Sequence, residues 1–240
     1  MSRIRILSVL FLLYIKNSAH GFISKFQPMN PKQHKFQTLI HDKNVSVVFG
    51  IGSAGTGKTL LSCQESLNLL HHKKMKKIII TRPTVSVEDE EIGFLPGTLE
   101  DKMSPWTRPI FDNLYHFYTI NDIHRFIQEN KIEICPIGFM RGRTFMDSII
   151  IVDEAQNTTP RQMKMILTRI GKNSKLVIVG DLKQSDLDEQ NGLQDIIYRL
   201  NNHYNDPSQM FQEGIGVVRF DDRHIVRHPL IEKIVNIYND

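Results

Sequence analysis

The sequence predicts an α/β fold built on a mostly parallel β-sheet with helices on both of its faces. Short apolar runs rich in β-branched residues recur along the chain and lack a polar face, which is typical of strands covered on both sides. Segments with helical periodicity separate these runs, as in parallel strands joined by right-handed crossovers. With 240 residues, of which 40% are hydrophobic and 23% charged, the chain suits a single globular domain.

Six strands and five helices are expected in chain order. The strands are predicted at residues 45–51, 77–81, 131–135, 148–152, 175–179 and 216–220. The helices are predicted at residues 57–70, 106–117, 161–170, 193–200 and 229–238. Residues 82–105 are rich in turn formers and irregular, and a long excursion inside a compact domain is usually functional.

The N-terminal residues resemble a secretory signal peptide. Arg3 and Arg5 precede an apolar stretch at residues 6–15, and Ala19 and Gly21 are spaced as small residues before a cleavage site. The stretch is too short for a transmembrane helix, so we expect no stable membrane anchor in the mature chain. The segment also resembles the entry signal of plastid proteins, which favours secretory or organelle targeting. The alternative is an N-terminal helix of a cytoplasmic protein.

This reading divides the chain into a leader at residues 1–21, a linker at 22–32 and one domain at 33–240. The formal net charge is +4, but the leader holds three basic residues and no acid. Without the leader, 27 basic residues face 26 acidic ones, so overall charge is weak support for nucleic-acid binding. The two cysteines cannot form a disulfide framework and are expected in the core.

A glycine-rich loop between a predicted strand and a predicted helix fits the pattern G-x-x-x-x-G-K-[ST]. Its glycines allow tight turns that direct backbone N–H groups at phosphate oxygens, and the next helix offers its positive end to the same anion. Lys58 is expected to contact the β and γ phosphates of ATP, and Thr59 to place its hydroxyl on Mg²⁺. The loop consists of Gly52, Ser53, Ala54, Gly55, Thr56, Gly57, Lys58 and Thr59.

Two acids follow the apolar strand predicted at residues 148–152. Because ligands of open α/β sheets bind at the carboxyl ends of strands, Asp153 is expected to hold Mg²⁺, directly or through water. Glu154 is expected to orient and deprotonate the water that attacks ATP. The alternative is an acidic helix cap. Gln184 follows the next predicted strand and is expected to hydrogen-bond the γ-phosphate or the attacking water.

The combination of Asp153-Glu154-Ala155-Gln156 with Gly180, Asp181 and Gln184 resembles the nucleotide-binding half of superfamily 1 helicases. Further motifs along the chain are Thr81-Arg82-Pro83, Gly93-Phe94-Leu95-Pro96-Gly97, Met140-Arg141-Gly142-Arg143-Thr144, residues 162–171 and Val226-Arg227-His228-Pro229. The ordered set of motifs resembles the PhoH-like ATPases over roughly residues 30–239.

The resemblance implies a single RecA-like P-loop domain that binds ATP with Mg²⁺ and takes part in RNA metabolism. It implies that Gln33 reads the edge of adenine, the alternative being an exposed linker residue. It makes Arg169 and Arg227 candidates for an arginine finger, the alternative for each being a surface ion pair. The stretch after Gln184 is too short for a second RecA-like domain, so we expect a homo-oligomeric ring, for which a hexamer is one form.

The predicted function is ATP hydrolysis coupled to single-stranded RNA. Candidate RNA contacts are Arg82, Arg141, Arg143 and Lys172, with Trp106 or Phe94 as a stacking face. The alternative for these residues is a role in the core or between subunits. Two other functions are open: a nucleotide-gated scaffold that acts on a protein partner, and a small-molecule kinase. Glu154 argues against the scaffold, because binding alone needs no positioned base. Asp153-Glu154-Ala155-Gln156 with the downstream Gly180, Asp181 and Gln184 argues against the kinase, which would also need an acceptor pocket and a lid.

Overall fold

The computed structural model describes residues 25–83, 108–185 and 191–221. The predicted leader at residues 1–21, nearly all of the irregular segment at 82–105 and the predicted helix at 229–238 lie outside these ranges. Phe94, Trp106 and Arg227 lie outside them as well. What was expected of these parts of the chain stays a prediction.

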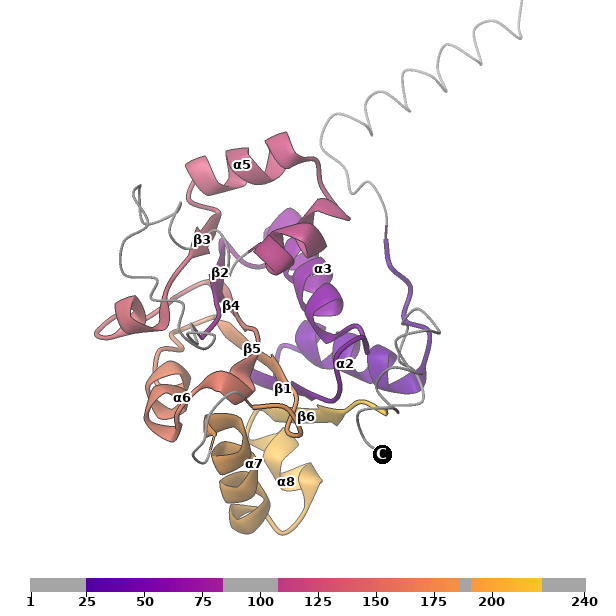
Figure 1. Ribbon diagram of the computed structural model, residues 1–240, viewed down its shortest axis with the longest axis vertical. Helices are drawn as coiled ribbons and strands as arrows, with labels where there is room; N and C mark the ends of the chain where they lie inside the picture. Colours follow the sequence, from indigo (N-terminus) through magenta and orange to yellow (C-terminus); the bar gives the residue numbers. More distant parts are fainter. Residues whose placement is uncertain (1–24, 84–107, 186–190, 222–240) are drawn as a thin grey trace, which may run out of the picture.

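The six strands form one parallel sheet in the order β3-β2-β4-β5-β1-β6 (Figure 1). Each strand corresponds to one of the six predicted apolar runs, so the predicted α/β fold is confirmed. Because every pair is parallel, the carboxyl ends of all six strands meet at the same edge of the sheet. The strands are β1 Val47–Ile51, β2 Lys77–Thr81, β3 Ile132–Ile134, β4 Ser148–Val152, β5 Lys175–Gly180 and β6 Ile215–Arg219.

Helices cover both faces of this sheet, as predicted (Figure 1). Neighbouring strand residues alternate between two cores: Ile78 and Ile80 belong to one, and Ile79 belongs to the other. The first core contains side chains of α2 Pro31–His41, α3 Lys58–His71 and α5 Ile120–Gln128. The second contains side chains of η2 Ile137–Met140, α6 Pro160–Leu167, α7 Gly192–His203 and α8 Pro207–Gln212.

The helices α3, α6 and α7 correspond to predicted ones, and residues 108–115 are helical within the helix predicted at 106–117. The helices α2, α5 and α8 were not predicted. Nowhere in the three described ranges is there a helix with the length and apolar character needed to cross a membrane.

The predicted linker at residues 22–32 is wrong for its described part. Asn30 caps α2 by accepting a hydrogen bond from the backbone N–H of Gln33, and Pro31 occupies the first turn. Further upstream, the amide of Gln64 on α3 clamps the backbone of Phe26. The Phe26 N–H donates to Gln64 Oε1 at 2.6 Å, and Gln64 Nε2 donates to the Phe26 carbonyl at 3.0 Å. Residues 25–32 therefore belong to the domain.

Candidate active site

The glycine-rich loop lies between β1 and α3, at the carboxyl edge of the sheet. Gly55 and Gly57 have φ angles of 84° and 85°, in the left-handed region that favours glycine. The Gly52 N–H donates to the carbonyl of Gly180 at 3.1 Å, which joins the start of the loop to the end of β5. The loop is thus held against the strand that leads to Asp181 and Gln184.

The ammonium group of Lys58 lies against the inner side of the same loop. Lys58 Nζ donates to the carbonyls of Gly52 and Ser53 at 2.5 and 2.8 Å, and to the Thr56 hydroxyl at 3.3 Å. The residue is buried at 8% exposure, so its charge is compensated by these oxygens rather than by bulk water. Any anion that enters the loop meets a positive charge already in place.

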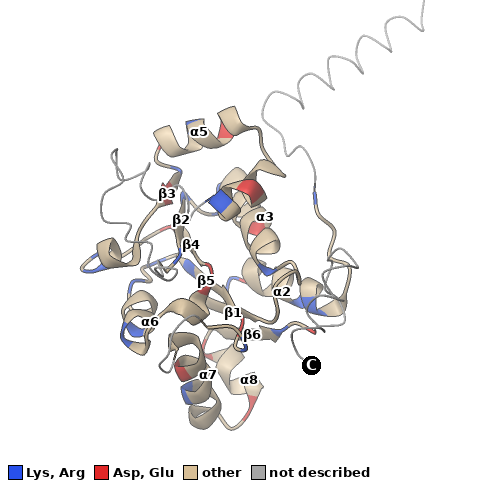
Figure 2. Cartoon of the chain, viewed as in Figure 1, with Lys and Arg blue, Asp and Glu red and all other residues tan. Residues whose placement is uncertain are grey.

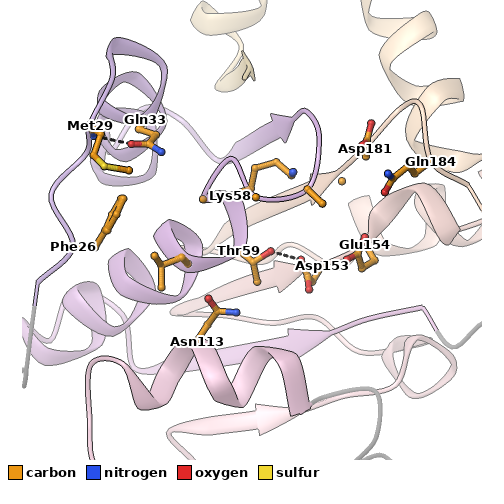
Figure 3. A pocket seen from close by; sticks show the side chains of 15 residues that line it. Phe26, Met29, Gln33, Lys58, Thr59, Asn113, Asp153, Glu154, Asp181 and Gln184 are labelled. Atoms are coloured by element: carbon orange, nitrogen blue, oxygen red, sulfur yellow. Dashed lines mark hydrogen bonds between the residues drawn. The ribbon is translucent and has the colours of Figure 1, made fainter. Parts of the chain in front are cut away.

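Thr59 and Asp153 bring the loop and β4 together. The Thr59 hydroxyl donates to Asp153 Oδ1 at 2.8 Å (Figure 3). Burial raises the pKa of Asp153 to about 6 and the neighbouring charge of Glu154 adds to the rise, whereas the hydrogen bond from Thr59 opposes it. One hydroxyl and one carboxylate, both oxygen donors, suit Mg²⁺, which takes few protein ligands and completes its shell with phosphate oxygens and water.

Glu154 stands beside Asp153 in an unusual backbone conformation. Its φ and ψ angles are 51° and 44°, in the left-handed region that non-glycine residues rarely adopt. Gln156 Nε2 donates to Glu154 Oε2 at 2.6 Å, and Arg82 Nη2 lies 3.5 Å from Glu154 Oε1. The carboxylate is therefore oriented from two sides while it remains half-exposed at the pocket.

One cavity of about 450 Å³ is lined by Lys58, Thr59, Asp153 and Glu154 (Figure 3). The phosphate loop, Asp153 and Glu154 form one part of it, and Phe26, Met29 and Gln33 stand at the end formed by α2 and the segment before it. An elongated ligand with a phosphate chain and a flat apolar ring matches this division. The complete lining is Phe26, Met29, Gln33, Ala54, Gly55, Gly57, Lys58, Thr59, Leu60, Asn113, Asp153, Glu154, Gly180, Asp181 and Gln184.

Gln33 is buried at 1% exposure, which rules out the exposed linker residue that the sequence left open. Its Oε1 accepts from the Met29 N–H at 2.7 Å, and its Nε2 donates to the Thr56 carbonyl at 3.0 Å. An amide has two donor hydrogens and two acceptor lone pairs, so one of each stays available beyond these bonds. Gln33 thus connects the apolar end of the pocket with the phosphate loop.

A family model described as PhoH-like protein matches residues 25–239. The chain belongs to the PhoH-like protein family. The resemblance noted in the sequence is thereby confirmed over nearly the whole chain.

Named relatives agree with this assignment. A PhoH-like protein of Bacillus subtilis is 43% identical over 199 residues, which cover 82% of this chain and 59% of the relative. A PhoH-like protein of Synechocystis is 41% identical over 226 residues, which cover 93% of this chain and 65% of the relative. The chain therefore spans about three fifths of the length of these relatives.

A solved structure shows the same fold. The large terminase from a thermophilic bacteriophage aligns with a TM-score of 0.51 and 12% identity, over 88% of this chain and 50% of the terminase chain. At this identity the likeness concerns the fold alone. The PhoH-like chain has the predicted architecture of a RecA-like P-loop domain.

The structure of the PhoH-like chain brings together most of the predicted site residues. Lys58, Thr59, Asp153, Glu154 and Gln184 all line the one pocket. Gln184 is exposed, and its labelled side chain in Figure 3 lies on the same side of the pocket as Glu154.

Two arginines with predicted roles have partners within the chain, and these roles stay predictions. Arg169 does not line the pocket of its own chain; it donates to the carbonyls of Met165 and Arg143 at 3.1 and 3.0 Å, at the amino end of β5. As an arginine finger it could act only on a neighbouring copy. Arg143 was expected to contact RNA, but its guanidinium forms two hydrogen bonds with Glu133, at 2.6 and 3.1 Å.

Several residues of the pocket were not assigned a role from the sequence. Phe26, Met29, Leu60 and Asn113 carry no motif. The segment before α2 provides Phe26 and Met29, α3 provides Leu60, and the helix at residues 108–115 provides Asn113. For Gln156, the sequence did give a reason to expect a role. It stands within the string Asp-Glu-Ala-Gln directly after a buried strand, where a buried amide would be expected to need partners.

Proposed function

We propose that this PhoH-like chain binds ATP with Mg²⁺ and hydrolyses it, and that hydrolysis is coupled to single-stranded RNA. The observation that carries the proposal is the meeting of Thr59 and Asp153 at 2.8 Å, next to Lys58 and Glu154 in one pocket. A phosphate loop alone would suit any phosphate ligand. A positioned carboxylate beside a metal-binding pair suits hydrolysis.

In the proposed complex, the loop from Gly52 to Thr59 surrounds the phosphates with backbone N–H groups. Lys58 exchanges its bonds to the loop carbonyls for bonds to the β and γ phosphate oxygens. The base lies between Phe26 and Met29, with Gln33 at its edge. Stacking on an aromatic ring supports this placement, since bases and aromatic side chains pack face to face.

Thr59 and Asp153 are proposed to hold Mg²⁺, which when bound would neutralise charge on the phosphate oxygens. Glu154 orients a water molecule and accepts its proton as the water oxygen attacks the γ-phosphorus. The bond between that phosphorus and the bridging oxygen breaks, and ADP and inorganic phosphate leave. Gln184 is proposed to contact the γ-phosphate or the attacking water.

An arginine from outside the pocket completes the proposal. Arg227 of the same chain, or Arg169 of a neighbouring copy, would stabilise charge on the transferring phosphoryl group. The second case requires a homo-oligomer, and a ring that can be hexameric is the arrangement proposed. Sedimentation of the full chain with ATP and Mg²⁺ is expected to show such an assembly, and a monomer at all concentrations would contradict it.

The proposal is tested by phosphate release from ATP, measured with the full chain in Mg²⁺, in EDTA, and in Mg²⁺ with single-stranded RNA. We expect release in Mg²⁺ without any acceptor molecule, loss in EDTA and stimulation by RNA. Asp153→Asn should raise the Mg²⁺ concentration required for half-maximal release. ATP binding without release would favour the nucleotide-gated scaffold, and release only with a small acceptor would favour a kinase.

A further inference from the structure

Two segments on either side of β4 carry basic residues and no acid. Residues 134–146 contain two arginines, and residues 155–180 contain five Lys or Arg, while neither segment contains Asp or Glu. Removing these seven from the 30 basic residues of the chain leaves 23 against 26 acidic residues. Each of these two segments therefore has a local excess of positive charge, which is the pattern that matters for binding a polyanion.

The fold places the two segments side by side. The Phe145 N–H donates to the carbonyl of Arg169 at 3.0 Å, and the Gly171 N–H donates to the carbonyl of Phe145 at 2.8 Å. The loop that carries η2 also packs against α6, and both contribute to the second core. Figure 2 shows blue on α6 and on this loop along the same flank of the molecule.

Four of the seven basic side chains are exposed, and all of them except Lys172 are on this flank. Arg141 follows η2, and Arg161 and Lys164 lie one turn apart on α6. By contrast, Arg143 is bound to Glu133, and Lys175 is buried. We call the surface formed by Phe139, Arg141, Arg161, Lys164 and the groove described next the α6 flank.

A groove of about 500 Å³ lies between α6 and α7. Its apolar lining includes Met163, Leu167 and Ile196, and Arg161 and Lys164 stand along its α6 side. On the α7 side, Arg199 is bound to Asp195 at 2.8 Å. An apolar floor with cations along its rim accommodates bases and phosphates of one strand at the same time.

An exposed aromatic ring completes this surface. Phe139 is 62% exposed although it belongs to η2, whose neighbours Ile137 and Met140 are buried. Arg141 follows it by two residues. A phenyl ring held out beside a guanidinium is the combination on which unpaired bases stack.

We infer that the α6 flank binds single-stranded nucleic acid, with Arg161, Lys164 and Arg141 on the phosphates and Phe139 stacked on a base. The inference rests on the proposed coupling of the ATPase to RNA and assigns it a place. Five residues, η3 Ala155–Asn157 with Thr158 and Thr159, connect Glu154 to α6, and the Gly192 N–H donates to the Thr158 carbonyl at 2.6 Å. A nucleic-acid strand that binds on α6 and α7 therefore contacts helices that are connected to Glu154, the candidate catalytic acid.

The chain provides a matched control for the test. Lys32 and Lys35 are exposed on α2 with the same three-residue spacing as Arg161 and Lys164. The double variants Arg161→Ala/Lys164→Ala and Lys32→Ala/Lys35→Ala remove the same charge from two different surfaces. Fluorescence anisotropy with a labelled oligouridine of about 15 nucleotides, at several salt concentrations and without ATP, measures the affinity of each full-length chain.

We expect the α6 variant to bind oligouridine at least about tenfold more weakly and with a shallower salt dependence, and the α2 variant to bind like the wild type. Phe139→Ala should weaken binding at least about fivefold without changing the salt dependence. Thermal unfolding of each variant shows that the loss is not one of folding.

Equal losses in both double variants, or no loss in the α6 variant, would overturn the inference. Displacement of oligouridine by polyglutamate at the same charge concentration would also overturn it and assign the α6 flank to an acidic protein. Because the assay contains no ATP, a wild type that binds oligouridine through α6 but releases no phosphate would refute the proposed hydrolysis and leave this inference standing.

Discussion

The buried amide of Gln156 bonds two parts of the candidate site at once. Its Nε2 donates to Glu154 Oε2 at 2.6 Å, and its Oε1 accepts from the Asp181 N–H at 3.0 Å. A Cβ atom on Gly180 would lie 2.6 Å from the same Oε1, so the end of β5 has space for this amide only because residue 180 is glycine. Gln156 is therefore a positioning residue for Glu154.

Replacing this amide tests its role. In Gln156→Ala, Glu154 loses a donor and the buried Asp181 N–H loses its acceptor, which we expect to cost about 1–3 kcal/mol of unfolding free energy. We expect kcat for ATP hydrolysis to fall at least about tenfold while KM stays within about threefold, because Gln156 does not touch the phosphate loop. Steady-state kinetics separate the two constants. An unchanged kcat would show that Glu154 is oriented without Gln156.

The carboxylate of Glu65 is the most heavily bonded acid of the helical layer that carries Gln33. Glu65 is fully buried, and its oxygens lie within hydrogen-bond distance of four side chains: Gln37, His41, Gln64 and Asn68. Burial alone would raise its pKa, but these hydrogen bonds, with that of His41 the largest, lower the pKa from 4.5 to about 2. Because Gln37 and His41 belong to α2, the network ties α2 to α3.

This shift predicts a pH dependence. Between about pH 2 and 4.5 the unfolded chain binds more protons at this residue than the folded chain, so stability rises with pH in that window. The contribution, about 3 kcal/mol, is fully present above about pH 5 and is lost as the pH falls through 4.5 toward 2. Denaturant unfolding of Glu65→Gln should show a deficit at about pH 7 that shrinks at about pH 3.5.

Glu213→Gln is the control, since Glu213 is exposed at the end of α8. It should leave the unfolding free energy unchanged at both pH values. A Glu65→Gln deficit of equal size at both pH values would mean that shape, rather than charge, explains the contribution.

Residues of the candidate site could be predicted only where the residues that form a motif lie close together in the sequence. The phosphate loop and the pair Asp153 and Glu154 are each recognisable within a few residues, and the structure brings them into one pocket. Phe26 is not, because its place depends on a clamp from Gln64, a residue far along the chain. Long-range hydrogen bonds of this kind leave no local pattern.

Among the secondary-structure elements, the strands were easier to predict than the helices. The central strand β4 is buried at every position. A strand in such an environment has a short apolar sequence rich in β-branched residues, which can be recognised directly. The unpredicted α2 and α8 have no sustained apolar stripe. The sequence marks the start of each helix only by a capping residue followed by proline, at Asn30-Pro31 and Asp206-Pro207. The unpredicted α5 begins at a cap formed by Thr119.

Packing between η3, α6 and α7 depends on Gly192. A Cβ atom at this position would lie 2.5 Å from the Thr159 carbonyl oxygen and 2.7 Å from the Thr158 hydroxyl. Because the first of these is backbone, α7 would have to move away from the segment that follows Glu154. The close packing of α7 against the segment after Glu154 thus supports the candidate site.

Gly192→Ala is expected to cost about 1–3 kcal/mol of unfolding free energy through this overlap. Gly138→Ala in η2 is the matched control, since a Cβ atom there would meet nothing within 4 Å. Denaturant unfolding of both variants measures the difference. Equal stability of the two would show that α7 is free to shift.

At the scale of the whole molecule, the parallel sheet explains why sequence-distant residues meet. The phosphate loop follows β1, Asp153 follows β4 and Gln184 follows β5, and these three strands are neighbours in the order β4-β5-β1. Since all strands run in the same direction, their carboxyl ends form one edge. The order of strands could not be read from the sequence, which indicates each run but not its neighbours.

The central claim is that this edge hydrolyses ATP with Glu154 as the base. Its most direct test is phosphate release by full-length Glu154→Gln at saturating ATP and Mg²⁺, beside the wild type and Glu213→Gln. The account predicts that Glu154→Gln binds ATP but releases phosphate at least about a hundredfold more slowly, and that Glu213→Gln matches the wild type. Release by Glu154→Gln at the wild-type rate would contradict the assignment of the base. A wild type that binds ATP and releases no phosphate would contradict the claim as a whole.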